Sequence, residues 1–149
     1  MPDHHVTWSE VSARLAGEKI YWLHTTSPDG TPNVSPVWGA VLVETLYLYT
    51  RSATVKARNL ALNPLVALHP ESGVDVLIVH GDLAHLGNPR GRPDVLEAFA
   101  AKYDQSDEIP FLPSVDPAFD VLYALEPAWA ITWSLPDTAA STRRWARGA

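Results

Sequence analysis

The sequence contains no cysteine, and this absence alone removes several kinds of chemistry. Without thiols there can be no disulfide, no thiolate metal ligand and no cysteine nucleophile. Apolar runs are only a handful of residues long, too short to cross a bilayer. The opening Met-Pro-Asp-His-His also lacks the basic and apolar regions of a secretory signal. We therefore expect a cytoplasmic protein that does not span a membrane.

Positive charge is scarce as well. The chain has 17 acidic and 11 basic residues, a formal net charge of −6, which argues against a general nucleic-acid-binding protein. One segment reverses this balance, because no Asp or Glu lies between Glu44 and Glu71, where Arg51, Lys56 and Arg58 are found. The few cations are therefore informative where they cluster.

Several common catalytic motifs are missing too. The chain has no Gly-x-Ser-x-Gly elbow, no Gly-x-Gly-x-x-Gly loop and no Walker A loop. The six histidines never show His-x-x-x-His spacing, so we expect ordinary histidines and no metal site. Asp75 and Asp82 flank a predicted strand, a pattern more typical of a solvated face than of an acid/base pair. We name no catalytic residue.

The sequence does contain 46% apolar residues, 13 prolines and six tryptophans. Its 149 residues predict one domain, 1–149, with a hydrophobic core and a C-terminal tail at 136–149. Hairpin-length links between the strands favour an antiparallel barrel. Strands are predicted at 19–26, 33–43, 45–50, 65–69 and 74–86, then as one strand or a pair at 121–125 and 128–135. Helices are predicted at 8–15, within 50–64 and from 93, and 104–119 as an ordered loop or lid.

The rest of the chain is organised around residues 50–64, a strand end followed by a short helix that Asn63-Pro64 terminates. Ser52 or Thr54 is the expected N-cap. Lys56 and Arg58 then lie in the first turns, where each cation opposes the helix dipole by roughly 0.3–1 kcal/mol. A bound anion would reverse the sign of these contributions.

Two interpretations of this helix stay open on the residues alone. One is a phosphate cradle. The other is a short amphipathic helix with a solvated basic side and an inner face of Val55, Asn59 and Leu62, broadened by Leu60 and Ala61.

The strand at 33–43 contains Pro36, which removes one N–H from the hydrogen-bond ladder. The segment Pro36-Val37-Trp38-Gly39 therefore places a pairing gap beside a large aromatic side chain. Such a strand could lend free backbone groups to a flat heterocycle, or it could be an edge strand with a core tryptophan.

Several segments together resemble the pyridoxamine 5′-phosphate oxidase-like superfamily, also called the flavin/deazaflavin oxidoreductase group. The similarity covers about residues 8–135 and depends on the order and spacing of the segments more than on any one of them. They are 23–32 (LHTTSPDGTP), 34–38 (VSPVW), 46–50 (LYLYT), 56–60 (KARNL), 63–68 (NPLVAL), 80–84 (HGDLA) and Lys102-Tyr103.

This resemblance implies a mainly β fold, a six-stranded antiparallel split β-barrel of Greek-key type with two or three short helices. It also implies a homodimer with FMN, our first choice, or coenzyme F420 at the interface. The expected activity is hydride transfer between the bound cofactor and a small organic substrate. By resemblance, Ser52, Lys56 and Arg58 hold the phosphate with help from Arg51 and Asn59. The ring is faced by Ser35, Pro36, Val37, Trp38, Tyr49 and Thr50.

The C-terminal end departs from the oxidase that gives the superfamily its name. The Arg-Leu-His-type segment that holds its substrate is missing, so vitamin B6 oxidation is not expected. Thr142-Arg143-Arg144-Trp145 looks instead like the endings of actinobacterial relatives assigned to FMN or F420. We expect Trp145 and its flanking arginines to fold against the pocket.

Two other functions are compatible with the same barrel. One is non-catalytic binding or storage of a flavin, haem or tetrapyrrole. The other is an interaction module without a cofactor.

Overall fold

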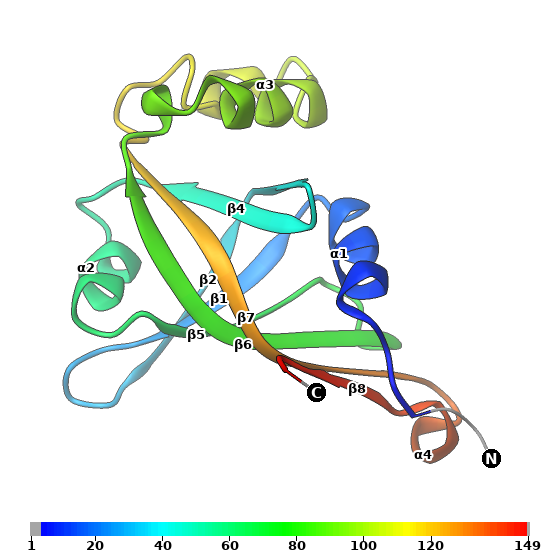
Figure 1. The fold of residues 1–149 in the computed structure, drawn as a ribbon. Coiled ribbons are helices and arrows are strands. Elements are labelled where there is room, and N and C mark those ends of the chain that lie inside the picture. The colour runs from blue at the N-terminus through cyan, green and yellow to red at the C-terminus, as the bar shows by residue number, and fades with distance from the viewer. Residues whose placement is uncertain (1–3, 149) are drawn as a thin grey trace.

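One antiparallel sheet forms most of the computed structural model, which describes residues 4–148. Its strands follow the order β2-β1-β5-β6-β7-β4-β3, and β8 pairs with β7 beside this path. Figure 1 shows the sheet curling round an interior, with helices α1, α2 and α3 at its margins. The predicted mainly β split barrel is therefore confirmed.

The strands are β1 Tyr21–Thr26, β2 Pro32–Val37, β3 Gly39–Leu42, β4 Thr45–Thr50, β5 Leu65–His69, β6 Asp75–Gly87, β7 Val121–Ser134 and β8 Arg143–Ala146. The helices are α1 Trp8–Ala16, α2 Val55–Leu62, α3 Pro93–Lys102 and α4 Thr138–Ser141, with 3-10 turns η1 Pro89–Gly91 and η2 Ile109–Phe111. No helix within residues 4–148 is long and apolar enough to cross a membrane.

The sheet has eight strands where the sequence predicted six. The predicted strand 33–43 is broken at Trp38 into β2 and β3, and the predicted tail adds β8. Gly39 permits the break, because a Cβ at this position would lie 2.9 Å from side-chain atoms of both Leu46 and Tyr21. Only glycine lets β3 begin this close to the interior.

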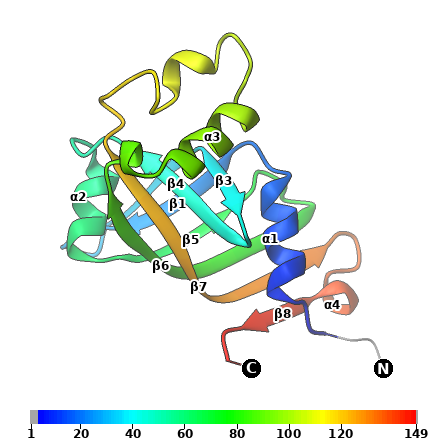
Figure 2. The same ribbon diagram turned by 45° about the horizontal axis from the view of Figure 1, so that its top comes forward.

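The break at Trp38 also explains why the sheet curls. β2 and β3 are the two edges of the main strand path, yet a single residue joins them. In a flat sheet of seven strands these edges would lie roughly 30 Å apart, at about 4.8 Å for each interval. One residue cannot cover that distance. The chain must therefore bring the edges together, which turns the sheet into a barrel (Figure 2).

Two apolar clusters flank β4. The interior of the barrel holds Leu23, Leu48, Leu68 and Val79 among others. Outside it, α3 packs over β3, β4 and β7 through a second cluster that includes Tyr49, Val95, Phe99, Tyr103 and Leu122. Strand β4 is consequently covered on both faces, so that adjacent residues Leu48 and Tyr49 are both buried.

Helix α2 buries only part of the predicted face, Asn59 and Leu60. Ala57, Asn59 and Leu60 are buried, whereas Val55 is 46% and Leu62 is 72% exposed. Asn59 is held by a hydrogen bond from its Nδ2 to Thr25 Oγ1 on β1, 3.1 Å away. This polar contact and the buried Leu60 set the rotation of the helix, which leaves Val55 and Leu62 exposed.

The C-terminal segment is ordered but does not cover the pocket of its own chain. Strand β8 pairs with β7, and Trp145 packs on Trp8 of α1 with ring centroids 4.9 Å apart. The expected folding of Trp145 against the pocket is therefore not observed within this chain. The tail extends the sheet because β7 is long enough to offer it a free edge.

One uncharged row crosses the outer surface of five strands. The pairing registers place Val34, His24, Ala67, His80 and Trp129 side by side from β2 to β7. His80 stacks on Trp129 with centroids 4.0 Å apart, while Val34 is 48% and Trp129 41% exposed. We call these five residues the outer row.

Candidate functional site

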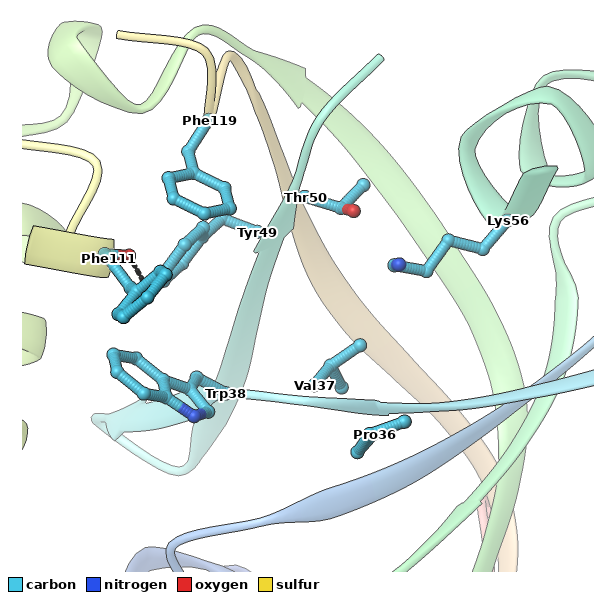
Figure 3. A pocket seen from close by; sticks show the side chains of 8 residues that line it. All are labelled: Pro36, Val37, Trp38, Tyr49, Thr50, Lys56, Phe111 and Phe119. Atoms are coloured by element: carbon cyan, nitrogen blue, oxygen red, sulfur yellow. Dashed lines mark hydrogen bonds between the residues drawn. The ribbon is translucent and has the colours of Figure 1, made fainter. Parts of the chain in front are cut away.

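A cavity of about 370 Å³ opens between β2, β4, α2 and the segment 104–120. This volume lies in the range of small-molecule pockets. Figure 3 shows its eight lining residues: Pro36, Val37, Trp38, Tyr49, Thr50, Lys56, Phe111 and Phe119. The first six are residues that the sequence analysis assigned to a cofactor. Two strand segments separated by residues 39–48, together with a helix, therefore meet at one pocket.

Aromatic rings form one end of the pocket (Figure 3). Trp38 stacks on Tyr103 of α3, with centroids 4.3 Å apart and planes within 2°. Tyr49 meets Phe99 and Phe119 edge to face, at 4.8 and 5.3 Å. Because each wall residue is packed against another ring, this end is preformed.

The segment 104–120 supplies Phe111 and Phe119, which the sequence analysis did not assign to the site. The Tyr49 hydroxyl donates a hydrogen bond of 2.7 Å to the Phe111 carbonyl and so fastens this segment to β4. Burial, followed by the nearby Tyr103, raises the pKa of Tyr49, which keeps the phenol protonated as a donor. The sequence offered one indication of their role, because both phenylalanines lie in a segment that was predicted as an ordered loop or lid.

The opposite end of the pocket carries one cation. Lys56, in the first turn of α2, points its ammonium group toward the cavity (Figure 3). Burial lowers the pKa of Lys56, and its Nζ has no hydrogen-bond or ion-pair partner among residues 4–148. A partly desolvated cation without a partner is stabilised by an anion placed beside it.

A second polar group near the pocket also lacks a partner. The Ser35 hydroxyl oxygen is buried without a hydrogen bond to any described residue. Ser35 precedes the lining residue Pro36 on β2 and shares the inward side of the strand with Val37. Buried hydroxyls are almost always paired in folded proteins, but Ser35, although expected to face the ring, is not itself among the residues that line the cavity.

Two residues expected at the phosphate are engaged by acidic residues instead. Arg51 forms an ion pair of 3.2 Å with Asp116 and lies over the Phe119 ring. The Ser52 backbone N–H and hydroxyl both donate to the Asp120 carboxylate, at 2.8 Å each. These two hydrogen bonds lower the pKa of Asp120. Arg51 and Ser52 therefore hold the end of the lid segment in this structure.

The remaining expected residues also lie outside the pocket lining. Arg58 donates from Nη1 to the Ala53 carbonyl at 3.0 Å, and Asn59 is held by Thr25. Thr54 is the N-cap of α2, because its hydroxyl accepts a hydrogen bond from the Ala57 N–H. Of Arg51, Lys56 and Arg58, only Lys56 contributes to the lining.

The arrangement suits a flat ring system with an anionic tail. The aromatic end offers ring-sized apolar walls, while Lys56 offers a charge that the fold itself leaves uncompensated. The unpaired Ser35 hydroxyl lies next to the lining residue Pro36 in the chain. The walls and the charge fit a flavin or deazaflavin with its phosphate at the Lys56 end. The lining contains no carboxylate or histidine that would serve as an acid or base.

Solved structures with the same fold include three informative ones. A conserved hypothetical protein of Mycobacterium tuberculosis aligns with 98% of this chain and 88% of its own, at 19% identity and a TM-score of 0.70. An F420 reductase aligns with 87% of this chain and 98% of its own, at 26% identity and a TM-score of 0.64. A heme binding protein of Mycobacterium smegmatis is 17% identical with a TM-score of 0.67, and the alignment covers 93% of this chain but 57% of that one.

A search of curated proteins gave no match. The family profile described as pyridoxamine 5′-phosphate oxidase, in contrast, matches residues 7–134, a range that includes every strand of the barrel except β8 and all eight lining residues of the pocket. The chain therefore belongs to the pyridoxamine 5′-phosphate oxidase family.

Proposed function

We propose that this protein binds FMN or coenzyme F420 in the pocket and acts as an oxidoreductase on a small organic substrate. The observation that carries the proposal is Lys56, an uncompensated cation at the far end of an aromatic slot. The 26% identity to an F420 reductase supports the deazaflavin, while FMN stays our first choice.

Each part of the pocket has a distinct role in this proposal. Trp38, Phe111 and Phe119 pack against the ring system and exclude water from it. Lys56 pairs with the phosphate, and the Ser35 hydroxyl meets a polar atom of the cofactor. The bound ring supplies hydride transfer, and the protein supplies position and electrostatics. No side chain is assigned as catalytic acid or base.

We further propose that the protein works as a homodimer in which a second copy covers the outer row. This row carries no Lys, Arg, Asp or Glu across five strands, and both of its ends are exposed. Leu65, on the same outer side of β5 as Ala67, is also 61% exposed, and its partner on β6 is the charged Asp82. Large exposed apolar patches mark association sites, which in identical copies usually have two-fold symmetry. Light scattering should give twice the chain mass of 16.3 kDa, and a monomer mass at micromolar concentration would exclude the dimer.

A cofactor carrier without enzymatic activity is the alternative. The fold shared with the heme binding protein and the lack of a carboxylate or histidine among the lining residues both favour it. A haem would use the same aromatic walls, but its iron needs an axial ligand such as His, Cys, Met or Tyr. Tyr49 is the lining residue of such a type, and its hydroxyl is kept protonated by burial and donates to the Phe111 carbonyl. The flavin or deazaflavin proposal is therefore the stronger one.

Parallel titration with FMN, F420, riboflavin and haem, followed by absorption and fluorescence, separates these functions. We expect FMN or F420 to bind more tightly than riboflavin, which lacks the phosphate. Bound cofactor that can be reduced and then reoxidised by an added organic acceptor supports the oxidoreductase. Tight haem binding without flavin binding would overturn it, and bound flavin without turnover would favour the carrier.

A further inference from the structure

A buried network at the end of α3 holds the peptide next to Trp38. Lys102, the last residue of α3, donates from Nζ to the Gly39 carbonyl at 2.6 Å and to the Tyr21 hydroxyl at 2.8 Å. Gly39 is the first residue of β3 and directly follows Trp38. Lys102 therefore links the end of α3 to the junction between the two edge strands, β2 and β3.

Tyr103 completes the same attachment from the next position of the chain. Its hydroxyl accepts a hydrogen bond from the Gly39 N–H at 3.0 Å and donates to the Lys19 carbonyl at 2.6 Å. Its ring is the platform on which Trp38 stacks. Both polar groups of Gly39 and the indole of Trp38 are thus fixed by two consecutive residues of α3 and its C-cap.

We infer that Lys102 is a positioning residue of the pocket, whose ammonium group holds the Gly39 carbonyl and thereby keeps Trp38 in place as the ring-binding wall. This inference rests on the proposed function, because it assumes that the ligand contacts Trp38. A hydrogen bond from a charged donor is about twice as strong as one between neutral groups. The protonated lysine therefore holds Gly39 more firmly than the neutral amine.

The surroundings of Lys102 make this hold sensitive to pH. Burial, and next the positive charge of Lys19, lower the pKa of Lys102 to about 8, while the carboxylate of Glu18 acts in the opposite direction. The other acidic group facing this region is Glu108, which pairs with Lys19 at 3.2 Å.

The phenols around Lys102 do not titrate in the same range. Burial raises the pKa of both Tyr21 and Tyr103, so each stays protonated when the lysine loses its proton. As the pH rises through about 8, the charged donor to Gly39 is replaced by a neutral one. Trp38 should then be held less firmly, and ligand affinity should fall.

NMR of the free protein tests the positioning without any ligand. With 15N-labelled glycine and tryptophan, the Gly39 amide and the Trp38 indole N–H should shift together with a midpoint near pH 8. Lys102→Met should abolish both titrations. Lys19→Met is the matched control, since it removes a neighbouring lysine that does not touch Gly39. It should keep the titrations and move their midpoint upward, because a like charge has gone.

Ligand titration then tests the consequence for the pocket. At pH 7, Lys102→Met should weaken FMN and riboflavin binding equally, by about tenfold, the effect expected for one charged hydrogen bond. Tyr103→Phe is a second variant for the case that Lys102→Met does not fold. It keeps the stacking ring but loses the hydrogen bond to the Gly39 N–H, and it should lower the affinity for both ligands equally.

The outcomes separate this inference from the proposed function. Gly39 and Trp38 signals that do not titrate near pH 8, or unchanged affinity in both variants, would overturn the positioning role. Wild-type protein that binds neither FMN, F420 nor riboflavin would overturn the proposed function and with it the effect on affinity. In that case, a common titration of the Gly39 amide and Trp38 indole signals would still show that Lys102 positions Trp38 through Gly39.

Discussion

The two ends of the pocket are built in opposite ways. At the aromatic end, Trp38 and Tyr49 are packed against further rings, and the Tyr49 hydroxyl is bonded to the lid segment. At the cationic end, Lys56 has no partner in the described chain, and the neighbouring Arg51 and Ser52 are turned to Asp116 and Asp120.

This difference indicates which part of a ligand each end is prepared for. The aromatic end is preorganised, so a ring gains contacts there without ordering many side chains. The cationic end keeps one charge available and leaves its final geometry to the anion. We therefore expect ring contacts to provide most of the affinity and Lys56 to discriminate between phosphorylated and unphosphorylated ligands.

Removal of the aromatic wall should have the largest effect. Trp38→Ala deletes the ring that stacks on Tyr103 and lines the pocket. Loss of an aromatic contact of this size costs about 3 kcal/mol, or roughly a hundredfold in affinity. FMN, F420 and riboflavin should all be affected alike in fluorescence titrations. A loss confined to the phosphorylated ligands would contradict the comparison of the two ends.

Removal of the cation should have a smaller and more selective effect. Lys56→Met should weaken FMN and F420 by about tenfold, since a bond to a charged group contributes about 1.5 kcal/mol, and should leave riboflavin unchanged. Burial lowers the pKa of Lys56, so the variant should be at least as stable as the wild type when no ligand is present.

Arg58→Ala is the matched control for Lys56→Met, two residues further along α2. Arg58 faces the Ala53 carbonyl and does not line the pocket, so its removal should change FMN affinity far less. Equal losses for both variants would show that both cations reach the phosphate, as the resemblance implied.

Ser52→Ala should change stability more than ligand discrimination. The variant removes the hydrogen bond from the Ser52 hydroxyl to Asp120 and keeps the one from the backbone N–H, so it should loosen the end of the lid segment and lower the free energy of unfolding by at most about 1 kcal/mol. The ratio of FMN to riboflavin affinity should stay constant. Urea unfolding and the two titrations measure these quantities. A loss of affinity for FMN but not for riboflavin would show that Ser52 binds the phosphate after all.

Mild acid should protonate histidines of the outer row and lower the stability of the fold. It should not change the ratio of FMN to riboflavin affinity. Burial lowers the pKa of His24, next to His69 with Nε2 atoms 2.9 Å apart, and also that of His80. The unfolded chain then takes up protons first, so stability is full above about pH 6.5 and is lost as the pH falls through the folded-state pKa values. Because water screens these partly exposed rings, the loss should stay below about 1 kcal/mol.

Urea unfolding at pH 7.5 and pH 5.5 measures this effect, and light scattering at the same pH values shows whether protonation also separates the dimer. His24→Gln should reduce the pH dependence. An unchanged slope in that variant would exclude His24 as its source, and an altered ratio of FMN to riboflavin affinity would mean that acid acts on the pocket itself.

Local signals in the sequence predicted most of the strands but not how they join. β4 and β5 begin and end at the predicted residues, because turn and proline residues bound them on both sides. The predicted strand 33–43 was too long, since the close approach of Leu46 and Tyr21 to Gly39 depends on residues distant in the chain. For the same reason the tail could not be predicted as β8, whose partner is β7.

The candidate site divides in a similar way. Six of the eight lining residues, among them Trp38 and Lys56, follow from short segments that resemble the family. Phe111 and Phe119 could not be predicted, because the lid reaches the pocket only after α3 has folded across β3 and β4. The contacts of Arg51 with Asp116 and of Ser52 with Asp120 could not be predicted either, since these partners lie more than 60 residues away in the chain.

The amino-acid sequence by itself determined the strand pattern, the family and the presence of one cation-rich segment after β4. These features depend on the order of neighbouring residues. The tertiary structure decided which cation faces the cavity, which rings wall it and where the tail lies. Each of these depends on contacts between residues far apart in the chain, such as Lys102 with Gly39 or Ser52 with Asp120, which form only when the sheet has curled and brought its edges together.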